Sequence, residues 1–411
     1  MILQNYILYL FKSLIWILLM KNSVFLNFLF LLLIKHKSKH IAIFIISIII
    51  VFLSASVLFL SSSLKKEIFQ TLENQNDFII QKINNGKVID IPTSWIEDFS
   101  LINGISKIEQ RVYGSYYFMP ENVYFTIVGV DLFEEHTNKN IKELLNILNI
   151  SDFLEQDSML IGNGVKKLFD KYHYFDSYDF KLFNKDIKNV KIFKDLPKEM
   201  NLVANDLIIM DITLAKEILN IKQNESSDIV LNVPNDLEKQ NIKEQLLLKH
   251  SNIRILEKED LKKMYENMFN YKGGIFLILF IVVLFTFVLI LYQRYSMISS
   301  NDKREIGILK AVGWSIKDII KLKIMENFLV AFIAFLVGII ISYIFVFILN
   351  APLLRNIFIG FSNIQNDFTI FTNIEISTLI TLFLFFMIPF LSAVLIPVWK
   401  IAIIDSTKSM K

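Results

Sequence analysis

Four long apolar runs constrain this chain more than any other feature of its sequence. No Asp, Glu, Lys or Arg interrupts them, apart from Glu326 at the start of the third run. A helix of about 20 residues crosses the roughly 30 Å hydrocarbon core of a bilayer. We therefore expect four transmembrane helices, at residues 41–63, 274–293, 325–349 and 376–398.

The composition indicates that a water-facing domain accompanies these spans. Hydrophobic residues make up 54% of the 411 residues, yet 20% are charged, too many for a chain embedded wholly in a membrane. The formal net charge is only +3, without the basic cluster that a nucleic-acid footprint needs, so we expect no nucleic-acid partner. The chain has no Cys, which excludes disulfides, thiol catalysis and Cys-ligated metal sites.

Lysine and arginine in the short flanks predict the orientation of the spans, because cytoplasmic loops carry an excess of both. Three lysines immediately precede the first span, and three lie in the tail 399–411. The loop 294–324 is strongly basic, whereas the loop 350–375 has a single Arg. We expect both termini and 294–324 in the cytoplasm, with 64–273 and 350–375 on the opposite side.

The N-terminal segment 1–40 allows three interpretations. Residues 22–34 are apolar but too short to span a bilayer, and they place apolar side chains on one face at helical spacing. We favour an interfacial helix here, lying at the membrane surface. An extra span and a translation start at Met20 are the alternatives. No small-residue cleavage site indicates a signal peptide, and we assign no structure to residues 1–19.

Residues 64–273 alternate strand-like and helical runs, which predicts an α+β domain of two subdomains. Charged segments at both ends predict helical stalks that continue the first and second spans. The predicted strands are Val123–Val130, Asp206–Met210 and Asp228–Val233, and the predicted helices are Trp95–Ile102, Ile141–Leu148, Thr213–Leu219 and Leu237–His250. The expected fold class is an α-helical membrane protein with four transmembrane helices. A large extracytoplasmic α+β domain stands on stalks between the first and the second.

The loop 294–324 carries signals for two short helices. The sequence Ser-Asn-Asp at 300–302 can cap the first helix. Gly313 stands where a left-handed residue would end it, and Ser315 with Asp318 forms a capping box that starts the second. Because the second helix runs on into the third span, this element suits the transfer of force from a cytoplasmic partner. The alternative is a solvated linker whose charges only set the topology.

The sequence carries no reaction chemistry that we can identify. The motifs G-x-x-x-x-G-K-[ST], H-E-x-x-H and G-x-S-x-G are all missing from it. His36 and His40 are interpreted as further members of the basic flank. No charged residue lies in the middle of a span, so the ion relay of a secondary transporter is not indicated. We expect no catalytic residue, no metal ligand, no bound cofactor and no enzyme activity of the chain itself.

Residues 303–319 resemble the cytoplasmic signature of the FtsX-like permease family, the membrane subunits of MacB/Lol-type ABC transporters. The family pattern R-E-I-G-I-L-K-A-x-G-x-S-x-x-D-I is met from Arg304 to Ile319. The tail from Pro397 resembles the closing motif P-x-x-K/R-x-A-x-x-D-P, with Ser406 in place of the final Pro. Broader similarity extends from about residue 22 to the C-terminus.

The resemblance implies a permease in the bacterial inner membrane, surrounded by lipid, that forms a dimer with a second copy or a paralogue. Each half would dock a cytoplasmic ABC ATPase, and ATP would bind to that subunit. The residues implied in coupling to the ATPase are Arg304, Glu305, Gly307, Lys310, Gly313, Ser315 and Asp318. Those of the C-terminal motif are Pro397, Lys400 and Asp405.

The cargo stays open between two classes within this family. One is the release of lipoproteins from the inner membrane, and the other is export or mechanical relay through a periplasmic adaptor. A different class of function is a signalling protein or an activator of cell-wall hydrolases that transports nothing. Capture of an ATPase with the chain would distinguish the first two from the third.

Overall fold

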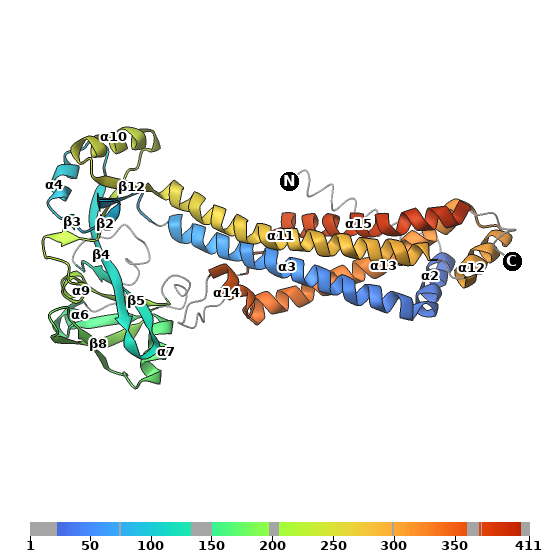
Figure 1. Cartoon of the computed structure of the whole chain (residues 1–411), viewed down its shortest axis with the longest axis horizontal. Helices are drawn as coiled ribbons and strands as arrows, with labels where there is room; N and C mark the ends of the chain where they lie inside the picture. The colour runs from blue at the N-terminus through green and yellow to red at the C-terminus, as the bar shows by residue number, and fades with distance from the viewer. Residues whose placement is uncertain are drawn as a thin grey trace. The chain divides into compact units, whose positions relative to one another are not determined.

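The computed structural model describes residues 23–73, 75–132, 150–196, 205–297, 300–359, 370 and 372–403. The chain forms two compact units. We call residues 1–59, 273–348 and 374–411 the helical unit. Residues 60–272 and 349–373 are the mixed unit. The labels in Figure 1 mark the elements of each.

The helical unit is built from long apolar helices. Among the described residues, four helices are long and apolar enough to cross a membrane, which confirms the four spans expected from the sequence. The elements that contribute to this unit are α2 (Ser23–Lys35), α3 (Lys37–Glu73), α11 (Lys258–Ser296), α12 (Ser300–Ala311), α13 (Ile316–Tyr343), the π-helical segment η4 (Ile344–Ile348) and α15 (Ile376–Ile403). The helices α3 and α11 extend beyond their apolar runs, because the charged sequence that flanks each run contains no Pro up to the helix end and, apart from Gly273 beside the second run, no Gly.

Small residues let α3 and α13 approach each other closely. A Cβ atom added to Gly338 would lie 2.8 Å from Val51 Cγ1 and 3.2 Å from the carbonyl oxygen of Ile48. One turn further along α13, the buried hydroxyls of Ser56 and Ser342 are hydrogen-bonded at 3.0 Å. In hydrocarbon such contacts replace the hydrophobic effect as the source of helix association.

The helix α15 packs through aromatic side chains although it contains Pro389 and Pro397. Phe386 stacks on Phe335 of α13, and Phe390 contacts Phe287 of α11. These aromatic contacts hold α11, α13 and α15, three of the four apolar helices, together.

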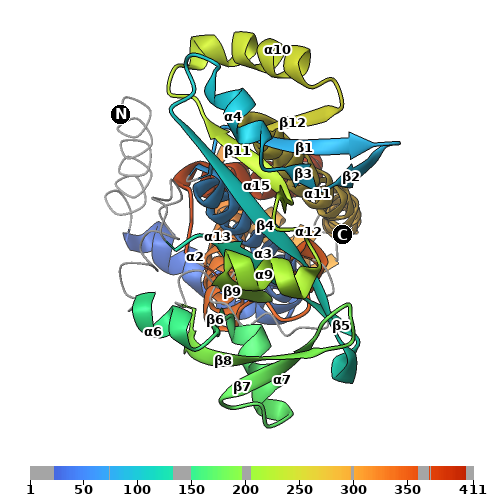
Figure 2. The same ribbon diagram turned by 90° about the vertical axis from the view of Figure 1, so that its left-hand side faces the viewer.

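The mixed unit contains a ten-stranded sheet with the order β12-β1-β11-β4-β5-β9-β6-β8-β7, to which β2 adds beside β1. Figure 2 shows the long strand β4 crossing this unit diagonally. The pairs β5–β9 and β6–β8 are parallel and the other pairs are antiparallel. The strands of this sheet are β1 (Phe78–Asn84), β2 (Lys87–Ile89), β4 (Lys107–Phe118), β5 (Val123–Val130), β6 (Ser158–Ile161), β7 (Ser177–Lys181), β8 (Ile187–Asp195), β9 (Leu207–Asp211), β11 (Asp228–Asn232) and β12 (Ile253–Glu257). The short strands β3 (Ile91–Pro92) and β10 (Glu225–Ser226) pair with each other in a second, two-stranded sheet.

Helices cover this sheet at both ends of β4. They are α4 (Trp95–Ser100), α6 (Ile150–Glu155), α7 (Asn163–Lys171), α9 (Ile212–Leu219), α10 (Lys239–Lys249) and the 3-10 turns η1 (Met119–Glu121) and η3 (Asp236–Glu238). A further helix of this unit, α14 (Leu354–Ile359), comes from the separate segment 349–373. The strand β5 has the bounds expected from the sequence, β9 is shifted by one residue at both ends, and β11 ends one residue earlier than expected. The expected helix Leu237–His250 begins as η3 and continues as α10. The expected helix Ile141–Leu148 lies outside the described residues.

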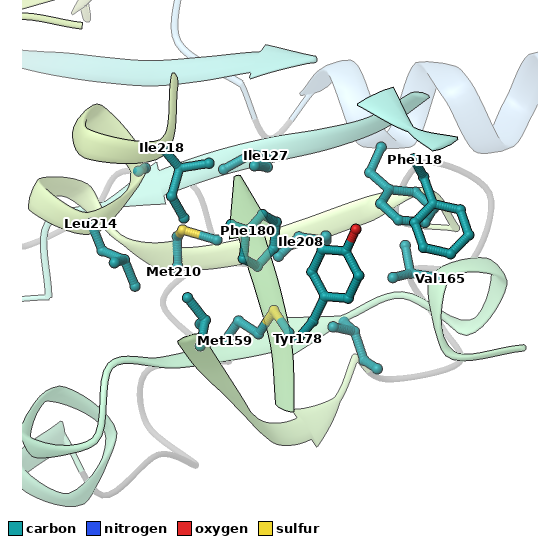
Figure 3. Close-up of a cluster of buried hydrophobic side chains, with 14 of the residues drawn as sticks. Phe118, Ile127, Met159, Val165, Tyr178, Phe180, Ile208, Met210, Leu214 and Ile218 are labelled. Carbon is teal, nitrogen blue, oxygen red and sulfur yellow. The ribbon is translucent and has the colours of Figure 1, made fainter. Parts of the chain in front are cut away.

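Two separate hydrophobic cores divide the mixed unit into two subdomains. One core joins β1, β11 and β12 to α4 and α10 through side chains such as Phe78, Phe99 and Leu246. The other joins β4–β9 to α7 and α9, and Figure 3 shows Phe118, Tyr178 and Met210 within it. The strand β4 is 12 residues long and pairs with β11 at one end and with β5 at the other, so it belongs to both subdomains.

A buried ion pair fastens β4 to β11 where the two subdomains meet. Arg111 donates to both carboxylate oxygens of Asp228, at 2.7 and 2.6 Å, and the Tyr113 hydroxyl donates to the same carboxylate at 3.1 Å. Asp228 is fully buried. Bidentate geometry of this kind fixes orientation as well as distance. The pair therefore sets the register of the strand that the two cores share.

We expect Gly338→Ala to destabilise the helical unit, because the new methyl group would overlap Val51. Overpacking of this kind costs about 1–3 kcal/mol. Gly274→Ala is the matched control, since a Cβ atom there meets no heavy atom within 4 Å. Thermal unfolding in detergent should show a lower midpoint for Gly338→Ala alone. Equal midpoints would contradict the close approach of α3 and α13.

We expect Asp228→Ala to destabilise the mixed unit by about 1–3 kcal/mol, because the partly exposed Arg111 side chain and the Tyr113 hydroxyl would lose a charged hydrogen-bond partner. The double variant Arg111→Met/Asp228→Leu should be much less affected, since it leaves no unpaired charge. Protease resistance of the full-length protein, measured over a range of temperature, would compare the two. A double variant as fragile as Asp228→Ala would argue against this assignment.

Candidate docking element

The helices α12 and α13 form the helix–turn–helix element that the sequence predicts. Gly313 ends α12 with φ +98°, and the Trp314 amide donates to the Leu309 carbonyl at 3.0 Å. This bond, together with that from the Gly313 amide to the Lys310 carbonyl, is the Schellman pattern of a helix end. The Ser315–Asp318 capping box then begins α13. The turn is thus held by backbone and side-chain bonds at both helix ends.

The inner face of this element packs on α2. Ile306 and Leu309 of α12 join Ile319 and Leu322 of α13 in one buried cluster with Leu29 and Leu32 of α2. The rings of Phe28 and Trp314 lie 5.7 Å apart beside it. The helix α2 lies within one residue of the bounds expected for a helix at 22–34, while its position at the membrane surface stays a prediction. Its contacts place it against the α12–α13 pair, which we call the docking element.

Glu305 of α12 contacts two lysines and a histidine from other segments. Its Oε2 lies 3.1 Å from Lys35 Nζ and 3.2 Å from His36 Nε2, and its Oε1 lies 3.5 Å from Lys323 Nζ. Burial would raise the pKa of Glu305, but Lys323, Lys35 and His36 outweigh that effect and hold the pKa below its usual range. Glu305 is therefore an internal residue of the element, with a side chain only 14% exposed.

Glu326, one turn further along α13 from Lys323, is buried in a second set of ionic contacts. Its Oε2 lies 3.0 Å from Lys323 Nζ and its Oε1 lies 2.8 Å from His40 Nε2 of α3. The neighbouring Asn327 accepts a hydrogen bond from the Tyr295 hydroxyl of α11. The interpretation of His36 and His40 as plain members of a basic flank is corrected here. Both rings reach carboxylates that are far away in the sequence, and no local pattern marks such partners.

The outward face of the element is apolar. Ile308, Val312 and Ile316 expose 54%, 73% and 43% of their surface, although they lie in a segment rich in charge. Our sequence reasoning missed this patch, which follows α12 at i, i+4 and continues across the turn. The available signal was the i, i+4 spacing of Ile308 and Val312, which places both on a different side of the first helix from Ile306 and Leu309.

The residues implied in ATPase coupling have different structural roles. Arg304 is exposed, Gly307 is buried and Lys310 is half-buried on α12. Gly313 forms the turn, and Ser315 and Asp318 bond each other. Glu305 faces the ionic contacts rather than the surface.

The C-terminal motif lies on another helix. Pro397 is buried and Lys400 is exposed, and both belong to α15. Asp405 lies outside the described residues.

Comparison with known proteins links one part of the chain to a family. Residues 276–405 match the family model described as FtsX-like permease C-terminal. No curated protein matches the chain.

Two solved structures are similar to parts of the chain. The periplasmic region of MacB from Actinobacillus actinomycetemcomitans is 13% identical, with a TM-score of 0.29, over 47% of this chain and 94% of that one. The extracellular domain of the ABC-type transporter YknZ from Gram-positive bacteria is 12% identical, with a TM-score of 0.28, over 44% and 100%.

We expect Glu305→Gln to lower stability at neutral pH by about 1–3 kcal/mol, because it removes the charge from bonds with Lys35 and Lys323. Since the pKa of Glu305 is lowered on folding, its contribution is complete above its unfolded pKa of about 4.3 and is lost as the pH falls through the lower folded value. Unfolding midpoints of the two proteins should therefore differ at pH 7 and converge in strong acid.

Arg304→Gln serves as the control for this experiment. It removes a charge from the exposed side of the same helical turn. A gap between wild type and Glu305→Gln that stayed constant down to pH 3 would contradict the ionic role of Glu305.

Proposed function

We propose that the chain is the membrane subunit of an ABC transporter, because residues 276–405 match the family model of the FtsX-like permease C-terminal region. A separate cytoplasmic ATPase docks on the α12–α13 element. The observation that carries this proposal is the exposed apolar patch of Ile308, Val312 and Ile316 on a firmly capped element. Apolar residues gathered at the surface favour a protein partner.

The mechanism that we propose assigns ATP hydrolysis to the partner and force transfer to this chain. The permease binds no cofactor itself, and ATP occupies the ATPase subunit. The capping box joins α12 to α13, and α13 runs on for 28 residues into a candidate span. Force applied to the patch would therefore move a continuous helix rather than a flexible loop.

The proposed setting is the bacterial inner membrane, with both termini in the cytoplasm and the mixed unit on the opposite side. Two permease copies, or this chain and a paralogue, would form the transporter. The charged parts of α3 and α11 would act as stalks. Within the mixed unit, Lys65 of α3 pairs with Glu266 of α11 at 2.5 Å, which supports a paired movement of these segments.

For cargo we propose export or release of a substrate on the far side of the membrane, with lipoproteins as the first candidate to test. In-cell crosslinking, affinity purification in detergent and mass spectrometry would address this directly. An ATPase together with acylated lipoproteins supports release, and an ATPase together with a periplasmic adaptor supports relay. Absence of any ATPase would overturn the proposal in favour of a non-transporting signalling protein or hydrolase activator.

We expect Val312→Asp and Ile308→Asp to reduce the captured ATPase at least tenfold. Each loses a buried apolar contact worth about 1.5–3 kcal/mol and adds a charge to the interface. Gly313→Pro should have the same effect, since Pro cannot adopt φ +98°.

Leu248→Asp is the control for these variants, because Leu248 is an apolar residue of α10 in the mixed unit that is also exposed, to 86%. All variants must reach the membrane at wild-type levels. ATPase capture that survives Val312→Asp would rule out the patch as the docking surface.

A further inference from the structure

Six charged or titratable residues link the start of the first span to the docking element. We call them the ionic cluster: Lys35, His36, His40, Glu305, Lys323 and Glu326. Lys35 and Glu305 are 270 positions apart in the chain, so their contact exists only in the folded protein. None of the six was needed to explain how the outward patch would bind a partner.

Lys323 is the centre of this cluster. Its ammonium group lies 3.5 Å from Glu305 on α12 and 3.0 Å from Glu326 on its own helix. The second oxygen of Glu326 contacts His40 of α3 at 2.8 Å. Polar contacts therefore run without a break from α12, through α13, to α3. A second branch leads from Glu305 to Lys35 and to His36, which lies at the junction of α2 and α3.

Burying the ionic cluster costs desolvation free energy, which is hard to account for unless the geometry of its contacts has a function. The Glu326 side chain is only 3% exposed. A buried ion pair is commonly no more stable than well-packed apolar residues of the same size. Nearby, the leucines of α2 already hold the docking element by apolar contact. Apolar contact is not directional, whereas hydrogen-bonded charges fix orientation and register.

We propose that the ionic cluster is the connection through which movement of α12 reaches α3. The proposal rests on the proposed function, since an ATPase must move α12. On this view the docking element drives two candidate spans at once. It drives α13 through the peptide chain and α3 through Lys323, Glu326 and His40.

The test uses the complex of the full-length permease with its captured ATPase. The chain has no native Cys, so Ile45→Cys on α3, where Ile45 is 50% exposed, gives one labelling site. An environment-sensitive fluorophore on that thiol reports the surroundings of α3. Its emission is recorded with and without a non-hydrolysable ATP analogue.

The informative variant is Lys323→Met/Glu326→Leu, which replaces the buried pair with apolar residues and should keep the fold. Lys317→Met is the matched control, because it removes an exposed charge from the first turns of the same helix. We expect the analogue to shift the emission in the wild-type background and in Lys317→Met. In the double variant the shift should be lost while the amount of bound ATPase is unchanged.

The outcomes separate this inference from the proposed function. Failure to capture any ATPase would refute the proposed function. With ATPase bound, an undiminished shift in the double variant, or no shift in the wild type, would overturn the role of the ionic cluster. If Lys323→Met/Glu326→Leu proves unstable, Glu305→Gln interrupts the same path at α12 and should reduce the shift.

Discussion

The helical unit depends on one constraint, which is that a polar backbone in hydrocarbon must satisfy its hydrogen bonds within the segment itself. Only helices and closed barrels meet this condition. Four apolar runs of sufficient length therefore become four helices, and the remaining question is how those helices recognise one another. Gly338 and the Ser56–Ser342 pair let backbones approach closely, and phenylalanines on α11, α13 and α15 fill the wider gaps.

Polar groups at the docking element follow a different rule. Glu326 is buried close to the start of a candidate span, and it keeps its place because Lys323 and His40 both contact its carboxylate. The same lysine reaches Glu305, so one ammonium group serves two helices. The inner face of the element is thus held by apolar packing and by directed charges together. Its outer face offers Ile308, Val312 and Ile316 to a partner.

The mixed unit shows how one long strand can serve two cores. Each core is closed by its own helices, and β4 passes from one to the other. The bidentate Arg111–Asp228 pair sits where a slip of register would turn every side chain of β4 to the wrong face. The two subdomains are thereby joined by a defined hydrogen-bonding register rather than by a flexible linker.

The sequence alone was sufficient to predict the four apolar helices, the strand β5, the α10 region and the whole architecture of the α12–α13 turn. These features depend on local rules: the length of an apolar run, the alternation of side chains, a Gly with positive φ and a capping box between residues three apart. Local rules also favoured an interfacial helix near residues 22–34, where α2 lies.

Only the tertiary structure decided which distant groups meet. Lys35 of Glu305, His40 of Glu326 and Arg111 of Asp228 are partners more than a hundred residues away, so no local pattern could identify them. For the same reason, the sequence did not show that His36 and His40 contact carboxylates. The outward apolar patch was recognised only in the structure, where α2 covers the inner face of α12 and leaves the patch exposed. Helices and turns follow from the sequence because their hydrogen bonds join residues that are close in the chain. Ion pairs between distant residues, and the side chains left exposed at the surface, depend instead on the tertiary fold.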